Sequence, residues 1–187
     1  MTEFDPVAAR SRLLELVRDR AYKDGLDIVL VSGKRSTFYI QGKKITLHPE
    51  GLYLFAMLLL EDLKQHPEIT AIGGLTMGAD PIAAAVSALS FSTGQNLNAF
   101  LVRKEAKGHG VGSKIEGEIH EGEKVAIIED TITTGGSALK AIDAAREVGA
   151  VPVVVYALAD REDSDADGFR AEFRVKSMFG LAEIKGD

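Results

Sequence analysis

The residues of this sequence that could carry out chemistry are concentrated between positions 125 and 137. Four apolar residues, which predict a buried strand, lead into two adjacent carboxylates, Glu129 and Asp130. Hydroxyl side chains and the glycines Gly135 and Gly136 follow, before a predicted helix over 137–148. Amides at a helix N-terminus have no partners within the helix and lie at the positive end of its dipole. The run therefore predicts an anion site, most often one for phosphate.

The two carboxylates need a different partner, because they would repel a phosphate. They suit the vicinal hydroxyls of a sugar, a hydrated Mg²⁺ or a developing positive charge. The combination predicts a sugar phosphate at the carboxyl edge of a sheet, where open α/β folds bind ligands. The sequence has neither a G-x-x-x-x-G-K-[ST] motif nor a G-x-G-x-x-G motif after a strand, which excludes those two nucleotide sites. A helix cap beside a flexible turn is the plain alternative, and the length of the run argues against it.

Positive charge is gathered at residues 103–121, although the whole chain is acidic, with a net charge of −6. Arg103, Lys104, Lys107 and His109 lie within seven positions, beside glycines that permit movement. An acidic protein that handles phosphates must concentrate its cations locally. Such a loop could fold over a diphosphate and exclude water. The alternative is a solvated basic loop with no ligand.

Strands and helices that would position these residues alternate along the chain. Asp5-Pro6 and Asp80-Pro81 have the form of an N-cap followed by proline at the start of a helix. Helices are predicted at about residues 6–21, 49–64, 80–90 and 137–148. Strands are predicted at 69–72, 98–102, 125–128 and 151–158, with a hairpin of 27–31 against 37–40 and a weakly alternating edge strand at 169–175. This order predicts an α/β protein with a mainly parallel sheet.

The composition is that of an ordinary globular protein and excludes several functional classes. The 187 residues suit one domain, 1–187, with 45% hydrophobic and 27% charged residues. The absence of cysteine excludes disulfides, thiolate metal sites and a cysteine nucleophile. The acidic net charge argues against a nucleic-acid partner. The longest apolar stretch, 52–60, is too short for a bilayer, and the first ten residues do not form a signal peptide. We therefore expect a cytoplasmic protein with no membrane partner.

Residues 125–137 resemble the phosphoribosyl diphosphate (PRPP) signature of type I phosphoribosyltransferases. Residues 103–110 resemble the mobile catalytic loop of orotate phosphoribosyltransferases within that family. The resemblance includes residues 32–40, 73–81 and 160–161, and it covers the chain from about residue 20 to 162. It implies the type I phosphoribosyltransferase fold, in which helices flank a central, mainly parallel sheet, with a small N-terminal hood and a mobile basic loop.

The activity implied by the resemblance is transfer of the 5-phosphoribosyl group from PRPP to orotate. The products would be orotidine 5′-phosphate and diphosphate, a step of UMP biosynthesis, formed through an oxocarbenium-like transition state. Mg²⁺ would be held by PRPP, with water linking it to Glu129 and Asp130. A homodimer is expected, with loop 103–120 shared across subunits. Two alternatives remain open: a phosphoribosyltransferase for a purine or uracil, and a non-catalytic regulator that senses PRPP and binds nucleic acid.

The resemblance also assigns roles to individual residues. It implies that Lys107, Asp130, Arg103 and His109 take part in catalysis. The residues implied in binding PRPP are Arg103, Lys104, Lys107, His109, Glu129, Asp130, Thr131, Ile132, Thr133, Thr134, Gly135, Gly136 and Ser137. Orotate would lie against Thr133, Arg161, Tyr39 and Ile40. Without the resemblance, Arg161 would be interpreted as a surface arginine paired with Glu162 or Asp163, and Tyr39 as a packing residue.

Two positions depart from the family pattern. Many bacterial members have a lysine before the Ser-Gly turn and another before the glycine of the turn that contacts diphosphate. This sequence has Val31 and Met77 at those positions. Four nearby cations could replace the missing charges: Lys34, Arg35, Lys43 and Lys44.

Overall fold

The computed structural model describes residues 4–29, 33–105 and 114–186. Its centre is a six-stranded sheet in the order β10-β9-β8-β5-β6-β7. The strands are β5 (Ile69–Leu75), β6 (Asn98–Val102), β7 (Ile115–Gly117), β8 (Lys124–Ile132), β9 (Val151–Asp160) and β10 (Val175–Gly180). All neighbours pair in parallel except β7, which runs antiparallel to β6. The expected mainly parallel sheet is therefore confirmed.

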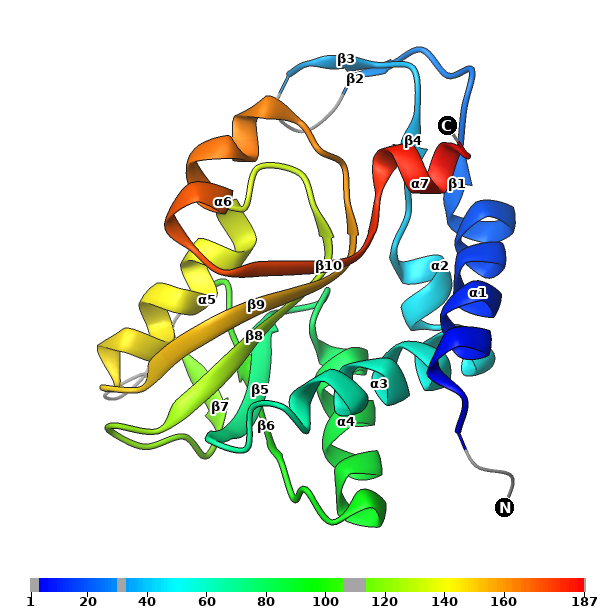
Figure 1. Cartoon of the computed structure of the whole chain (residues 1–187). Helices are drawn as coiled ribbons and strands as arrows, with labels where there is room; N and C mark the ends of the chain where they lie inside the picture. The colour runs from blue at the N-terminus through cyan, green and yellow to red at the C-terminus, as the bar shows by residue number, and fades with distance from the viewer. Residues whose placement is uncertain (1–3, 30–32, 106–113, 187) are drawn as a thin grey trace.

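Helices cover both faces of this sheet (Figure 1). On one face lie α5 (Gly136–Glu147) and α6 (Asp167–Glu172), and on the other lie α1 (Pro6–Leu16), α3 (Pro49–Leu63) and α4 (Asp80–Thr93). Strand β8 serves both cores because successive side chains of a strand point to opposite faces. Val125 and Ile127 pack in the core beneath α5, while Ala126 and Ile128 pack in the core beneath α3 and α4.

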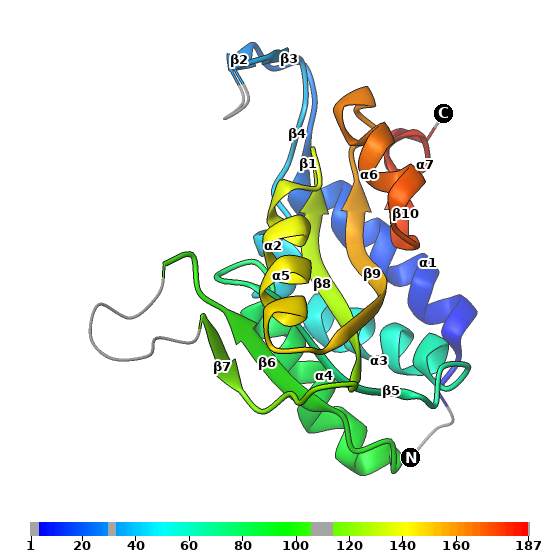
Figure 2. The ribbon, with the colours of Figure 1, turned by 90° about the vertical axis from the view of Figure 1, so that its left-hand side faces the viewer.

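A small N-terminal hood lies beyond the carboxyl ends of β8 and β9 (Figure 2). It contains β1 (Tyr22–Lys23) paired with β4 (Tyr39–Ile40) and β2 (Ile28–Val29) paired with β3 (Arg35–Ser36). The short helix α2 (Lys43–Thr46) follows the hood and packs against α3. The hairpin prediction was wrong in its pairing. In the described part of the first segment, β2 pairs with β3, which lies between the two predicted strands in the chain, and β4 pairs with β1 instead.

The C-terminal segment closes the fold against the N-terminal helix. An edge strand was expected at 169–175, but residues 167–172 form α6 and the edge strand β10 begins at Val175. After β10, helix α7 (Leu181–Lys185) lies beside α1, where Arg10 pairs with Glu183 at 2.6 Å. Arg18 donates a further bond of 2.6 Å to the carbonyl oxygen of Glu183. Arg18 belongs to η1 (Val17–Ala21), a π-helical turn that extends α1.

The helix starts were predicted with mixed success. Asp5 caps α1 by accepting bonds from the amides of Val7 and Ala8, as expected. Asp80 is not an N-cap: α4 begins at Asp80, with Ala79 before it. The acidic segment after β9 contains a short 3₁₀ turn, η2 (Ser164–Ala166). Within the described ranges, no helix is both long enough and apolar enough to span a bilayer.

Strands β5 and β8 run further than the sequence predicts, and this extension shapes the site. β5 continues through Gly73 and Gly74 instead of ending before them, because these glycines allow a close approach of neighbouring strands. A Cβ atom on Gly73 would lie 2.0 Å from the carbonyl oxygen of Phe100. β8 continues to Ile132 and not 128, so the two carboxylates belong to the strand.

Candidate active site

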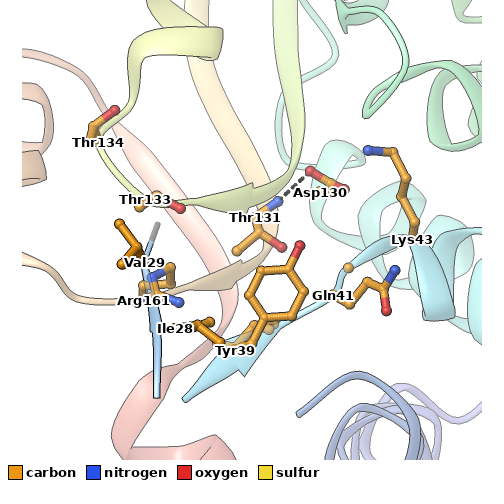
Figure 3. A pocket seen from close by; sticks show the side chains of 12 residues that line it. Ile28, Val29, Tyr39, Gln41, Lys43, Asp130, Thr131, Thr133, Thr134 and Arg161 are labelled. Atoms are coloured by element: carbon orange, nitrogen blue, oxygen red, sulfur yellow. Dashed lines mark hydrogen bonds between the residues drawn. The ribbon is translucent and has the colours of Figure 1, made fainter. Parts of the chain in front are cut away.

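A cavity of about 640 Å³ lies between the hood and the carboxyl ends of β8 and β9 (Figure 3). Its lining combines two hood strands, the segment before α2, the end of β8 and the residue after β9. The lining residues are Ile28, Val29, Tyr39, Ile40, Gln41, Gly42, Lys43, Asp130, Thr131, Thr133, Thr134 and Arg161. Tyr39, Ile40, Thr133 and Arg161, the four residues expected at the acceptor, all contribute to this main cavity.

A smaller cavity of about 80 Å³ adjoins it at the N-terminus of α5. The turn over residues 133–135 and the start of α5 line this cavity, together with Glu129, Thr131 and Ile132. Within the described chain no side chain caps α5, and the amide of Gly136 donates only a 3.4 Å bond to Thr134. The start of α5 therefore presents amides and hydroxyls to an anion, as the sequence predicts.

Gly135 is required at this turn for two reasons. Its φ of 78° lies in the left-handed region, and a Cβ atom would lie 2.4 Å from the ring of Phe169. Phe169 belongs to α6, so a helix from the C-terminal segment packs directly under this turn. The position of the turn is therefore fixed by packing as well as by its own backbone.

Glu129 and Asp130 form an acidic pair near the end of β8. Burial raises the pKa of Glu129 to about 8, and the adjacent charge of Asp130 contributes to the shift. Burial also raises the pKa of Asp130, an effect opposed by the positive charge of Lys43. One Asp130 oxygen accepts a 2.9 Å bond from the amide of Thr131. Positive charge arriving with a ligand would favour the ionised form of both groups.

Two glycines bring other segments against the acidic pair. A Cβ atom on Gly42 would lie 2.7 Å from Oγ1 of Thr131, and one on Gly78 would lie 3.1 Å from Oδ1 of Asp130. Gly42 precedes α2, and Gly78 lies in the turn between β5 and α4. The role of Gly42 could not be predicted, since a lone glycine carries no signal of a contact with a strand far away in the sequence.

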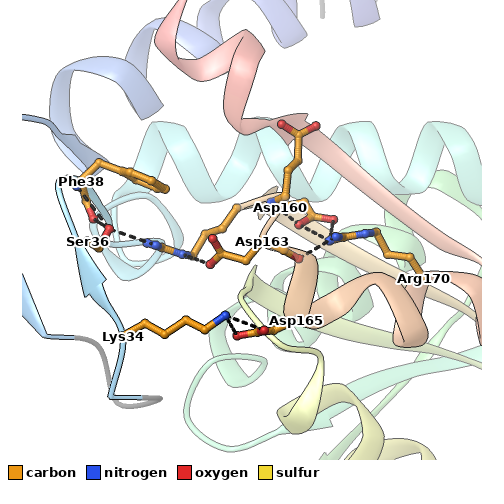
Figure 4. Close-up of polar contacts among 9 residues, drawn as sticks. Lys34, Ser36, Phe38, Asp160, Asp163, Asp165 and Arg170 are labelled. Carbon is orange, nitrogen blue, oxygen red and sulfur yellow. Dashed lines mark hydrogen bonds and ion pairs between the residues drawn. The ribbon is translucent and has the colours of Figure 1, made fainter.

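Arg161 is fixed in the wall of the main cavity by contacts from two segments. Only 3% of it is exposed, so its interpretation as a surface arginine is wrong, although it does pair with Asp163 at 3.0 Å. Its Nη2 atom donates to Oγ of Ser36 at 3.2 Å, and its guanidinium lies 4.3 Å from the centre of the Phe38 ring. The three residues that make these contacts, Asp163 and the hood residues Ser36 and Phe38, lie close together in Figure 4. Tyr39, by contrast, is 40% exposed.

The predicted basic residues are divided between regions of the molecule. Arg103 pairs with Glu116 at 2.9 Å. Arg103 and Lys104 line a separate cavity of about 550 Å³, together with Thr76 and Met77. They do not line the main cavity. Lys107 and His109 lie outside the described residues, and so does Val31.

Of the four cations near the hood, one lines the main cavity. Lys34 pairs with Asp165 at 2.6 Å, and Arg35 pairs with Asp27 (Figure 4 shows the first of these pairs). Lys44 is exposed and absent from the cavity lining. Lys43 contributes its side chain to the cavity, on the side of Asp130 (Figure 3).

The donor set around the acidic pair suits a hydrated cation more than one held entirely by protein. Among the described residues, no cluster of three or more His, Cys, Asp or Glu side chains could hold a metal ion. Glu129 and Asp130 offer two carboxylates, and Oδ1 of Asp80, two residues after the Gly78 that packs against Asp130, is buried without a hydrogen-bond partner among the described residues. Such a set fits Mg²⁺ that reaches the site on an anionic substrate and keeps its waters.

Comparison with known proteins identifies the family. No protein-family model matches the chain. An orotate phosphoribosyltransferase of Thermosynechococcus vestitus is 45% identical over 178 residues, which cover 94% of this chain and 93% of that protein. An orotate phosphoribosyltransferase structure from Mycobacterium tuberculosis, in complex with Fe(III) dicitrate, has a TM-score of 0.79 at 38% identity, covering 94% and 98% of the two chains. The M. tuberculosis enzyme in complex with PRPP has a TM-score of 0.74 at 34% identity, covering 95% and 92%. The chain therefore belongs to the orotate phosphoribosyltransferase family and has the type I phosphoribosyltransferase fold.

Proposed function

We propose that this protein transfers the 5-phosphoribosyl group of PRPP to orotate, releasing orotidine 5′-phosphate and diphosphate in UMP biosynthesis. The proposal rests on one observation: three features follow one another in adjoining cavities. They are a turn suited to an anion, an acidic pair and a buried arginine. Their order matches a ribose 5-phosphate joined to a base that carries a carboxylate. The family relationship, at 45% identity over most of the chain, supports the same reaction.

Each part of the donor, its 5-phosphate, its ribose and its diphosphate, would have its own partners in the site. The turn and helix start, residues 131–137, would hold the phosphate through backbone amides and the hydroxyls of Thr133, Thr134 and Ser137. Glu129 and Asp130 would accept hydrogen bonds from the ribose hydroxyls. Mg²⁺ bound to PRPP would neutralise part of the diphosphate charge, and the acidic pair would contact its waters.

The acceptor would be oriented by the arginine after β9. Orotate has a planar carboxylate, which a guanidinium can bind through parallel hydrogen bonds. Arg161 is held by Asp163 and Ser36 before any ligand arrives, so little conformational freedom is lost on binding. Tyr39 and Ile40 would form the platform for the ring, and Thr133 would contact its edge.

In the reaction, a nitrogen of orotate forms a bond to the anomeric carbon while the bond from that carbon to diphosphate breaks. The electron pair of the broken bond leaves with the diphosphate, and the ribose passes through a state of oxocarbenium character. Asp130 would stabilise the positive charge on the ribose. Arg103, Lys104, Lys107 and His109 would stabilise the negative charge of the leaving group.

We further propose a cytoplasmic homodimer in which residues 1–187 form one domain and loop 103–120 serves the neighbouring subunit. The position of Arg103 and Lys104 supports the shared loop, since both line a cavity separate from the acidic pair of their own chain. The oligomeric state can be checked by light scattering. Mixing Arg161→Ala protein with Lys107→Ala protein tests the sharing: mixed dimers should regain activity, because one of their two sites is intact.

The acceptor is tested by turnover with PRPP, Mg²⁺ and a panel of bases. Orotate should be used at least about 100-fold faster than uracil, adenine or hypoxanthine, since only orotate has the carboxylate that Arg161 can bind. Arg161→Lys keeps the charge and loses the planar fork, so it should lose most orotate turnover. Ready reaction with another base would contradict the proposed acceptor. Turnover that is unchanged after chelation of Mg²⁺ would contradict the proposed cofactor.

A further inference from the structure

Lys43 lines the main cavity, and the packing of the backbone just before it fixes its position. It is the first residue of α2 and follows Gly42, which packs against β8. A Cβ atom on Gly42 would lie 2.7 Å from Oγ1 of Thr131, so a larger residue there would displace the start of α2. The side chain of Lys43 lines the cavity, and its amino group lies on the side of Asp130 (Figure 3).

The ammonium group of Lys43 lies near three carboxylates but forms an ion pair with none of them. Burial raises the pKa values of Asp80, Glu129 and Asp130, and the positive charge of Lys43 opposes each rise, so Lys43 lies within electrostatic reach of all three. Among the described residues it forms no ion pair or hydrogen bond, whereas Arg161 pairs with Asp163. Its three N–H donors are therefore available to a ligand.

The geometry of the donor places its diphosphate at this end of the cavity. In PRPP the 5-phosphate and the diphosphate are attached at opposite ends of the ribose. The 5-phosphate turn begins at Thr133, and Thr134 and Lys43 lie on opposite sides of Thr131 (Figure 3). A ribose that reaches from the turn to the acidic pair would direct its diphosphate toward Lys43.

The turn over residues 76–79 lies on the same side of the acidic pair. Gly78 packs against Asp130, and α4, a helix of 14 residues, begins two residues later at Asp80. Helix N-termini attract anions, but this turn contains no cation, since Met77 stands there with 70% of its surface exposed. Arg103 and Lys104 share with Thr76 and Met77 a cavity that is separate from the acidic pair. A diphosphate on the side of the three carboxylates therefore needs a positive charge from another segment.

We infer that Lys43 supplies this charge by binding the diphosphate group of the donor, between α2 and the turn over residues 76–79. The inference rests on the proposed function, because it takes PRPP as the donor. It assigns to α2 a direct part in substrate binding and resolves the choice among Lys34, Arg35, Lys43 and Lys44 in favour of Lys43.

Calorimetric titrations of Lys43→Met with three ligands test the inference. PRPP and inorganic diphosphate, each with Mg²⁺, carry the group that Lys43 would bind, whereas ribose 5-phosphate lacks it. Affinity for the first two should fall about 10-fold or more, which corresponds to about 1.4 kcal/mol. Affinity for ribose 5-phosphate should change less than about 2-fold. Lys44→Met, which alters the neighbouring exposed lysine, should bind all three ligands as the wild type does.

Two results would overturn the inference. Equal weakening of all three ligands would show that Lys43 acts through the acidic pair on the ribose, and unchanged binding of diphosphate would show that it makes no contact. Lys43→Arg keeps the charge and should retain most of the PRPP affinity. Thermal unfolding of each variant checks that α2 is intact. The proposed function fails separately, if the wild type binds PRPP but does not transfer its ribosyl group to orotate.

Discussion

Asp163 fixes the orientation of Arg161: its carboxylate accepts a hydrogen bond of 3.0 Å from Nε of the Arg161 guanidinium. Asp163 lies in the segment after β9, while two further contacts of the guanidinium come from the hood: Oγ of Ser36 at 3.2 Å and the ring of Phe38 at 4.3 Å. The arginine therefore joins two parts of the fold that are separated by more than 100 residues. Its orientation is set by the protein, so an acceptor that binds it, as proposed above, would meet a pre-organised partner.

Replacing Asp163 with alanine should weaken orotate binding selectively. The guanidinium would keep its charge but lose one of the bonds that orient it, so we expect KM for orotate to rise about 10-fold. KM for PRPP should change less than about 2-fold. Steady-state kinetics with each substrate varied in turn measures both constants. Asp163→Asn keeps an acceptor oxygen and should give an intermediate value. The matched control is Asp165→Ala, which removes the partner of Lys34 in the same segment.

An equal rise of both KM values in the Asp163 variant would contradict this role. It would show that the bond supports the whole cavity and not the orientation of one arginine.

The buried carboxylate of Glu129 should make stability depend on pH. Its pKa is raised from the usual 4.5 to about 8, so between these values the folded protein binds more protons than the unfolded chain. The free energy of unfolding therefore falls as pH rises through this window, and the loss is complete above about pH 8. Glu129→Gln removes this titration. The variant should match the wild type near pH 4 and exceed its thermal midpoint at pH 8 to 9.

Thermal unfolding in the absence of ligands, followed across this pH range, provides the measurement. Glu147→Gln, at the exposed end of α5, is the control and should follow the wild-type curve. Parallel curves for Glu129→Gln and the wild type would show that the folded protein does not hold the extra proton.

Patterns that are local in sequence predicted much of this structure. The apolar runs at 98–102 and 151–158 became β6 and β9, and the glycine-rich turn leads into α5, whose start has no side-chain cap among the described residues. These predictions succeeded because strand periodicity and unpaired helix amides depend on neighbouring residues.

Tertiary contacts decided what the sequence could not predict. β8 extends to Ile132 because β9 pairs with it that far, Thr131 opposite Ala159 and Ile132 opposite Asp160. The apolar residues at 169–175 suggested a strand, but Phe169 belongs to a helix and packs under Gly135. The place of Lys43 in the cavity depends on Gly42 meeting β8, a contact that no spacing along the chain reveals.

Lys107, which lies outside the described residues, is the basic residue from which we expect the largest catalytic effect. A cation that meets the leaving diphosphate as its charge develops stabilises the transition state more than the bound donor. Lys107→Ala should therefore lower kcat about 100-fold or more, while PRPP affinity changes less than about 3-fold. Single-turnover kinetics and equilibrium binding separate the two quantities. Lys124→Ala, at the start of β8, is the control. Comparable losses in rate and affinity would mean that Lys107 acts in ground-state binding.

Gly135 should tolerate no side chain, because its backbone and its neighbour both exclude one. An alanine would be held at a φ of 78°, at a cost of about 1–2 kcal/mol, with its Cβ atom 2.4 Å from the ring of Phe169. We expect Gly135→Ala to lower the thermal midpoint by about 4–8 °C, as a loss of about 2 kcal/mol would.

The same substitution should also displace the amides at the start of α5. PRPP affinity should fall about 10-fold or more, measured well below the midpoint, while KM for orotate changes little. Gly168→Ala is a matched control in α6, where a Cβ atom would meet no atom within 4 Å. It should keep or raise the midpoint, since alanine favours a helix over glycine by about 1 kcal/mol. If Gly135→Ala bound PRPP with wild-type affinity, the 5-phosphate would have to lie elsewhere than in this turn.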